Sequence, residues 1–259
     1  MEVLLKRFNA GMTNDIDIFI WLLATFLLAG MVKGITGMGL PTVAMAILGA
    51  LYSPVVAAAL LIVPSLITNF WQFLSGGYRW LVLTRFLSMM LGILVGAFLG
   101  APLLSQLDKE WAAFGLGSAL LLYSLYSFFA PALIILPKYE AWLSPIVGFL
   151  TGWITGATGV FVLPAVPYLQ ALGLQKNELI QALGLSFTVS TLALLSSLAV
   201  QHSLDVEHLK LSIYAVVPAL AGMWLGSVIR KRVSVAQFRL WFLITLSLLA
   251  MDLMSRPFR

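Results

Sequence analysis

Runs of apolar residues long enough to cross a membrane follow one another along almost the whole chain. A helix needs about 20 mostly apolar residues to span the hydrocarbon core of a bilayer. Eight full or nearly full runs cover residues 16–33, 54–74, 81–104, 111–129, 142–155, 179–200, 209–229 and 238–253, and two shorter apolar pieces cover residues 40–51 and 160–172. We therefore predict an all-α polytopic membrane protein with about eight transmembrane helices and two short segments.

The composition excludes a soluble domain and narrows the chemistry. Charged residues make up 10% of the chain and hydrophobic residues 61%, whereas a soluble domain carries about 25% charged residues. With no cysteine and two histidines, a disulfide, a Cys-ligated metal and a multi-histidine metal site are not expected. The net charge is +5, but the basic residues are scattered near the ends of the runs, where they anchor spans. We expect a lipid bilayer around the protein and no nucleic acid as a partner.

A glycine-rich pattern occurs twice and indicates an internal duplication. Four residues recur 122 positions later, namely Gly30, Gly34, Thr36 and Gly37 as Gly152, Gly156, Thr158 and Gly159. Pro41 and Pro164 match one position out of this register, and residues 96–100 are echoed by residues 222–226. We predict two homologous repeats, residues 1–134 and 135–259, with their boundary in the linker around residues 131–140.

Each copy of the pattern predicts a broken helix, one near residues 30–41 and one near residues 148–164. Glycine costs about 1 kcal/mol relative to alanine inside a helix, and a proline follows in both copies. Irregular backbone at membrane depth is tolerated where protein buries it or where it lines a water-filled cavity. Gly/Pro-interrupted segments at matching positions of two halves point to a transporter's binding site, and the free N–H groups of such breaks favour an anion.

Close helix packing is the alternative explanation of the glycines. A Gly-x-x-x-Gly spacing lets two membrane helices approach closely, which would account for this spacing in both copies. It would not account for the Thr-Gly pair and the proline that follow. For the glycines without these additions we predict packing; they are Gly92, Gly96, Gly100, Gly222 and Gly226.

Lys33 is the one charged residue within either glycine motif. A cation in a span usually faces a cavity or a partner, where it could attract an anion. Its position near the end of the first run also fits an ammonium group that reaches the lipid headgroups, and both interpretations stay open at this point. Among the polar residues that follow the motifs, Asn69 and Gln181 are the best candidates. The predicted substrate-binding residues are Lys33, Gly34, Thr36, Gly37, Gly39, Asn69, Gly156, Thr158, Gly159 and Gln181.

The acidic residues argue against catalysis. All ten lie near the ends of the runs or in loops, whereas a membrane protease or a carboxylate-relayed proton pump needs buried acids. The chain also has no Walker motif for ATP. We predict a secondary transporter, not an enzyme, without a cofactor or a bound metal.

The first glycine motif, residues 30–41, resembles the first signature of the sulfite exporter TauE/SafE family, a G-x-x-x-G-x-T-G-x-G segment followed by proline. Residues 148–164 are similar to the second signature, although Val160, Phe161 and Val162 stand where a run of glycines often continues. The resemblance implies an eight-span carrier of the cytoplasmic (inner) membrane that moves sulfite, sulfoacetate or a related sulfur-containing anion. We expect export coupled to an ion gradient. A passive anion channel, or a carrier for another small organic anion, is the alternative.

The charges leave the topology open. Eight spans with a cytoplasmic N-terminus make the repeats parallel and place Arg230, Lys231 and Arg232 outside, against the positive-inside rule. If the short segments complete a crossing, each half has five crossings and the repeats are inverted. Arg79 could then share the inner face with the basic cluster at residues 230–232. The resemblance favours eight spans, and a homodimer stays open.

Overall fold

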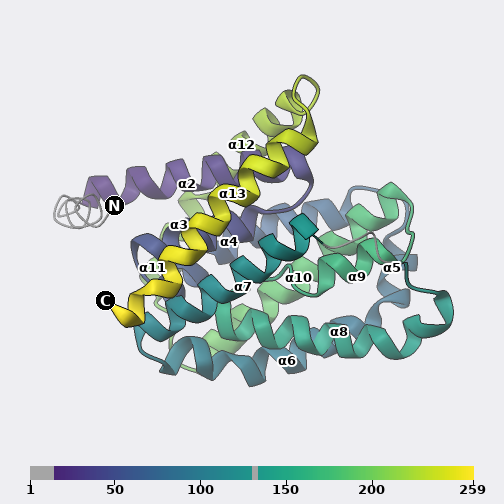
Figure 1. Cartoon of the computed structure of the whole chain (residues 1–259), viewed down its shortest axis with the longest axis horizontal. Helices are drawn as coiled ribbons and strands as arrows, with labels where there is room; N and C mark the ends of the chain where they lie inside the picture. Colours follow the sequence, from purple (N-terminus) through teal and green to yellow (C-terminus); the bar gives the residue numbers. More distant parts are fainter. Residues whose placement is uncertain (1–14, 130–133) are drawn as a thin grey trace.

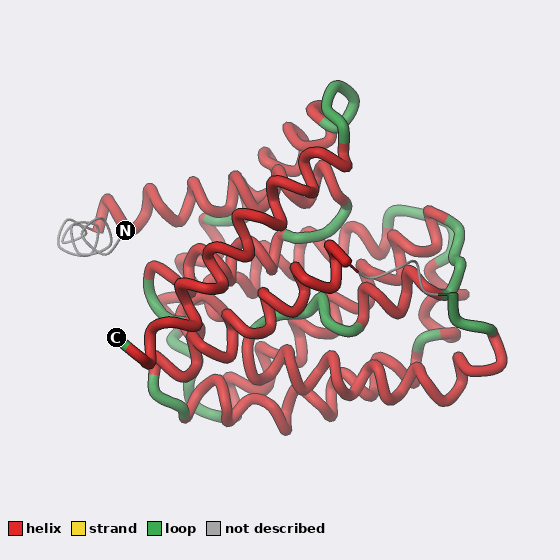
Figure 2. The backbone as a smooth tube through the Cα atoms, viewed as in Figure 1, coloured by secondary structure: helices red, strands yellow, loops and turns green. Residues whose placement is uncertain are grey.

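The computed structural model describes residues 15–129 and 134–259. In these two ranges every regular element is a helix, and short loops connect the helices (Figure 2). The helices are α2 (Asp15–Thr36), α3 (Leu40–Leu51), α4 (Pro54–Leu74), α5 (Arg79–Arg85), α6 (Leu87–Gln106), α7 (Lys109–Phe129), α8 (Pro137–Thr158), α9 (Ala165–Ala171), α10 (Lys176–Val200), α11 (Val206–Tyr214), α12 (Val216–Ile229), α13 (Val235–Ser255) and the 3-10 helix η1 (Arg256–Phe258). The prediction of an all-α protein is confirmed for this part of the chain.

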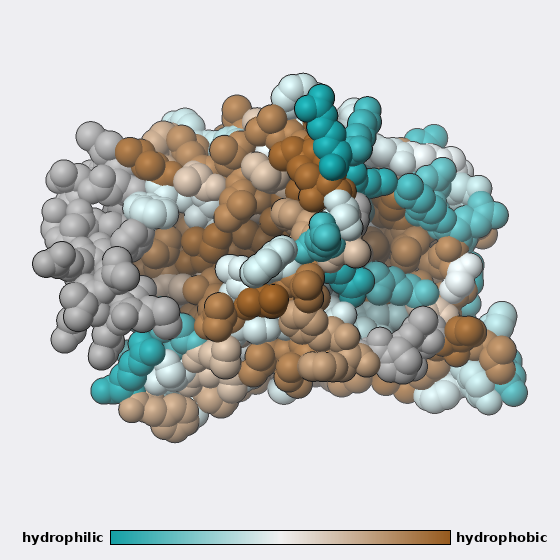
Figure 3. All heavy atoms as spheres, turned by 45° about the horizontal axis from the view of Figure 1, so that its top comes forward, coloured by the Kyte–Doolittle hydropathy of each residue, from teal (hydrophilic) through white to brown (hydrophobic). Residues whose placement is uncertain are grey.

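Seven candidate membrane spans occur among the described residues. They are Phe19–Thr36, Pro54–Leu74, Leu87–Gln106, Lys109–Phe129, Lys176–Val200, Val206–Ile229 and Ala236–Phe258. α3 is apolar but shorter, and α8 has the length of a span, 22 residues, but begins with a polar turn that contains Lys138 and Glu140. Large apolar side chains such as Trp224 and Trp241 are exposed on the outside, and one face is hydrophobic over a broad area (Figure 3). The protein is therefore a multi-pass membrane protein.

Two of the predicted runs are each divided by a turn. Residues 81–104 hold the end of α5 and most of α6, which are separated at Phe86, and residues 209–229 hold parts of α11 and α12, separated at Ala215. Pro218 explains the second division, because it has no N–H to donate to the carbonyl group four residues earlier.

Glycines bring two pairs of parallel helices into close contact. Gly30 of α2 lies so near α12 that an added Cβ would come within 2.1 Å of the Ala219 carbonyl oxygen, and Gly34 faces α12 in the same way. An added Cβ at Gly152 or Gly156 of α8 would likewise come within 2.0 or 2.1 Å of a carbonyl oxygen of α6. The prediction of packing is confirmed for the partner glycines at 92, 96, 100, 222 and 226, which face α8 or α2. Close packing also explains the Gly-x-x-x-Gly part of both motifs.

Two pairs of helices, α4 with α10 and α7 with α13, run antiparallel where they contact each other. Ser65 in the middle of α4 hydrogen-bonds Thr191 in α10, and Gln72 near the end of α4 reaches the Ile180 carbonyl oxygen near the start of α10. In the same manner, the start of α7 contacts the end of α13, and the end of α7 contacts the start of α13. Each of these contacts joins a helix before residue 130 to a helix after residue 133.

Basic residues occur in several connections between the helices. Arg79 begins α5, and Arg230, Lys231 and Arg232 form the α12–α13 loop. In Figure 1, α5 and the start of α8 lie at the right, the start of α2 and the end of α13 lie at the left, and the α12–α13 loop projects at the top. The number of crossings in each half and the direction of insertion stay predictions.

Candidate functional site

The first glycine motif separates α2 from α3 by a sharp break. α2 stops at Thr36, and Gly37 and Gly39 take φ angles of 82° and 109°, which residues with a side chain rarely adopt. The Thr36 hydroxyl donates to the Val32 carbonyl oxygen (2.9 Å) and accepts the N–H of Met38 (3.3 Å). The predicted break is present, and Thr36 stabilises it by capping the end of α2.

The second motif makes the same turn and continues into a longer non-helical segment. Gly159 has a φ angle of 73°. The Thr158 hydroxyl donates to the Ile154 carbonyl oxygen (2.7 Å) and accepts the N–H of Val160 (3.2 Å). The helix that follows, α9, begins only at Ala165, so the apolar piece predicted at residues 160–172 is helical over a shorter range. Residues 160–162 are fully buried, and their apolar side chains fill this break.

Lys33 lies one turn before the first break and is buried, with 3% of its surface exposed. Its ammonium group donates to Thr68 Oγ1 (3.1 Å) and to Asn69 Oδ1, both on α4. The explanation by contact with lipid headgroups is therefore wrong. Within residues 15–129 and 134–259, no acidic side chain forms an ion pair with Lys33. The side-chain partners of Lys33 in this part of the chain are the neutral groups of Thr68 and Asn69.

Hydrogen bonds continue from the partners of Lys33 on α4 to α10. Asn69 donates to Ser65 Oγ (2.9 Å), and Ser65 Oγ lies 3.0 Å from Thr191 Oγ1 on α10. The side chains of Ser65, Asn69 and Thr191 are fully buried. We call Lys33, Ser65, Thr68, Asn69 and Thr191 the Lys33 cluster.

Two glutamines connect α10 to the end of α4. Gln181 donates to the Phe73 carbonyl oxygen (2.7 Å) and accepts the N–H of Tyr78 (2.7 Å). Gln72 donates to the carbonyl oxygen of Gly37 at 3.3 Å. The polar groups of Gln181 are therefore used within the protein, and Gln72 steadies the first break.

The predicted site residues thus fall into several groups. Lys33 and Asn69 are in contact. Gly34 and Gly156 lie at helix contacts, and Gly159 faces the side chain of Met45. None of the hydrogen bonds described above joins a residue of the first break to a residue of the second.

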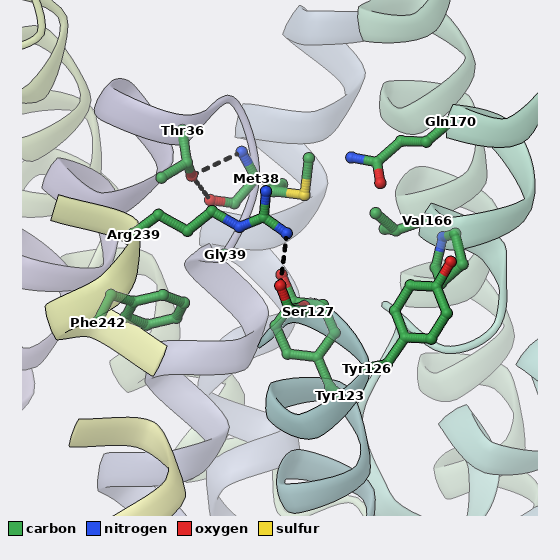
Figure 4. A pocket seen from close by; sticks show the side chains of 11 residues that line it. Thr36, Met38, Gly39, Tyr123, Tyr126, Ser127, Val166, Gln170, Arg239 and Phe242 are labelled. Atoms are coloured by element: carbon green, nitrogen blue, oxygen red, sulfur yellow. Dashed lines mark hydrogen bonds between the residues drawn. The ribbon is translucent and has the colours of Figure 1, made fainter. Parts of the chain in front are cut away.

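A cavity of about 170 Å³ lies beside the first break. Thr36, Met38 and Gly39 line it, together with Tyr123, Tyr126 and Ser127 of α7, Val166, Pro167 and Gln170 of α9, and Arg239 and Phe242 of α13. Arg239 and Gln170 extend toward it from α13 and α9 (Figure 4). The sequence did not point to Arg239, because a single cation at the start of an apolar run also fits an anchor at a span end.

A comparison with known protein families shows which family the chain belongs to. The model of the family described as Sulfite exporter TauE/SafE matches residues 22–253, which is most of the chain and includes both breaks. The chain belongs to the TauE/SafE family. No curated protein and no solved structure gave a match. As a TauE/SafE member, the protein is a membrane transporter of the sulfite and anion exporter type, with a small anion as its substrate.

A further polar cluster of this TauE/SafE protein lies where α5, α8 and α10 meet. Arg85 of α5 binds both carboxylate oxygens of Glu140 on α8, at 2.6 and 2.8 Å, and Glu178 on α10, at 2.7 Å. Bidentate pairs of this kind are among the stronger hydrogen-bonded contacts in proteins. Arg85 therefore joins three helices, and sequence spacing gave no signal of it, because the three residues are far apart in the chain.

Proposed function

We propose that the protein is a secondary carrier that exports a small sulfur-containing anion, sulfite or an organosulfonate such as sulfoacetate, across the cytoplasmic membrane. Membership of the TauE/SafE family supports an anion of this kind. The observation that carries the proposal is the buried ammonium group of Lys33, whose protein partners are neutral.

The charge of Lys33 is what an anion would compensate. A buried charge without a counter-ion is costly. Thr68 and Asn69 offer oxygen atoms to the ammonium group but no negative charge. An ammonium group has three N–H donors, and one of them is left for a ligand. An oxyanion at this position would accept that donor and neutralise the charge.

We assign the substrate site to the Lys33 cluster and the neighbouring break at Gly37 and Gly39, with the second break at Thr158 and Gly159 completing it from the other half. The halves, residues 1–134 and 135–259, would then be inverted repeats. The antiparallel contacts between α4 and α10 and between α7 and α13 support this arrangement. In transporters built in this way, the site lies at the interface of the repeats.

Coupling to an ion gradient does not require a carboxylate at the site. The buried acids among the described residues, Glu178 and Asp252, lie near helix ends and pair with arginines. A proton can travel on the anion itself, because sulfite takes up a proton near neutral pH. The proposal includes no catalytic step and no cofactor.

Uptake by proteoliposomes tests the proposal. We expect saturable flux of labelled sulfite or sulfoacetate that responds to a pH gradient. Lys33→Gln should raise the half-saturating concentration about tenfold or more, because hydrogen bonds to charged groups contribute roughly 1.5–3 kcal/mol, and Lys33→Arg should retain part of the affinity. The melting temperature of Lys33→Gln should not fall, since the change removes a buried charge.

A matched control is Lys210→Gln, which removes an exposed lysine that pairs with Glu207. It should transport like the wild type. Absence of saturable flux for every sulfur oxyanion would contradict the proposed function, and equal transport by wild type and Lys33→Gln would remove Lys33 from it. Counterflow separates the carrier from a passive channel, because only a carrier accumulates label against unlabelled substrate.

A further inference from the structure

We infer that the cavity at Arg239 is a second anion site, separate from the Lys33 cluster, which binds an organic oxyanion with a second polar group before it is transported. The inference rests on the proposed transport function and adds to it a place and a ligand class. Four properties of the cavity support it: its positive charge, the polar groups that lie across from Arg239, its volume and its position near Lys33.

The charge of the cavity is positive. Arg239 is exposed. A guanidinium group has five N–H donors, and among the described residues Arg239 donates to the Ser127 carbonyl oxygen at 3.3 Å. No acidic residue lines the cavity, and no carboxylate of the described residues forms an ion pair with Arg239. The planar fork of arginine matches the geometry of two oxygen atoms on one anion. Arg239 is therefore suited to bind a sulfonate or carboxylate group.

The wall opposite Arg239 offers neutral polar groups. Gln170 approaches from α9 and Tyr126 from α7, and in Figure 4 both lie across the cavity from the guanidinium group. Neither side chain has a hydrogen-bond partner among the residues that the structure describes. An amide and a phenol can each donate or accept a hydrogen bond. A ligand held by Arg239 at one end would therefore find partners for a second polar group at its other end.

The volume admits an anion larger than sulfite. The cavity measures about 170 Å³, and an engineered apolar cavity of about 150 Å³ holds a benzene molecule. Arg239 and Gln170 at its border are exposed, so an anion somewhat larger than benzene can extend past the border. A two-carbon or three-carbon chain with an oxyanion at one end and a polar group at the other fits this space.

The position of the cavity relates it to the Lys33 cluster. Thr36 lines the cavity, and Lys33 lies three residues earlier on α2, about 4.5 Å away along the helix axis. Arg239 is near the start of α13, directly after the basic α12–α13 loop. An anion that enters beside this loop would therefore meet Arg239 first and Lys33 second.

Calorimetry on the purified full-length protein tests the site without relying on transport. The ligands are sulfoacetate, malonate and sulfite, which separate a two-ended sulfonate, a two-ended carboxylate and a small oxyanion. Arg239→Gln should weaken binding of sulfoacetate and malonate about tenfold or more, with an intermediate effect for Arg239→Lys. Gln170→Leu should weaken the same two ligands severalfold and leave sulfite unchanged.

The control is Arg232→Gln, which removes the same charge from the exposed α12–α13 loop and should bind all ligands as the wild type does. Melting temperatures of all variants should stay close to that of the wild type. Unchanged sulfoacetate binding by Arg239→Gln, or an equal loss in Arg232→Gln, overturns the site. An equal loss of sulfite binding in Gln170→Leu overturns the two-ended ligand. If binding follows the expectation but wild-type proteoliposomes transport nothing, the site stands and the proposed transport function fails.

Discussion

The two helix breaks share one local turn and differ in their surroundings. In both, a threonine hydroxyl accepts the N–H two residues later, and a glycine with positive φ follows. An added Cβ at Gly37 would meet nothing within 4 Å, whereas at Gly159 it would lie 2.5 Å from Met45 Cε. The first break borders the cavity and lies one turn from Lys33; the second is filled by buried residues 160–162. The same sequence pattern thus leaves space in one half and is closely packed in the other.

Valine at the two glycines should give the largest difference. Both positions have φ angles that β-branched residues rarely adopt, and only Gly159→Val also collides with a neighbour. We expect Gly159→Val to lower the melting temperature more than Gly37→Val, because the buried side chain of Met45 must also move, and Gly37→Val to be folded but inactive. Thermal unfolding and proteoliposome uptake measure the two effects.

The control for Gly37 is Gly173→Val in the loop between α9 and α10. Gly173 has a φ angle of 65° and open space around it, so the backbone strain is similar while the proposed site is untouched. It should transport the anion. Normal transport by Gly37→Val would exclude the first break from the site, and a folded, active Gly159→Val would show that the second break tolerates more than its packing suggests.

Removal of the two threonine hydroxyls should have an intermediate effect. Thr36→Val and Thr158→Val keep the shape of the side chain but leave a backbone N–H without its partner, at a cost of about 1–3 kcal/mol. We expect similar losses of melting temperature. Transport should differ, with a severalfold higher half-saturating concentration for Thr36→Val, because Thr36 lines the cavity. Equal transport defects would mean that both breaks contribute alike to the anion site.

The smallest effect is expected at the link between the halves. Thr191→Val removes the contact with Ser65, which keeps its bond to Asn69, and should change transport by no more than a few fold. Thr188→Val is its control, since the Thr188 hydroxyl donates to the Gly184 carbonyl oxygen in its own helix and has no other partner in the described part of the chain. A defect in Thr191→Val comparable to that of Lys33→Gln would show that the second half contributes directly to binding. Uptake under one set of conditions compares all three variants.

The sequence by itself determined the membrane environment, the family signature and the location of both breaks. These properties depend on neighbours along the chain. A run of apolar residues requires lipid or protein around it wherever it packs. The turns after Thr36 and Thr158 follow from a glycine and from hydrogen bonds within four residues. Lys33 could also be recognised as a candidate from the sequence, because a charged residue beside a break within a membrane span is unusual.

Only the tertiary structure decided which polar groups meet. Asn69 contacts Lys33, whereas Gln181, an equally good candidate by sequence, holds the backbone near the end of α4. Arg239 faces a cavity, although its place at the start of an apolar run equally suits a surface anchor. Gly34 packs against α12, although its motif also contains a break. The physical reason is that a helix presents side chains on all sides, and only the neighbouring helices determine which side faces lipid, protein or a cavity.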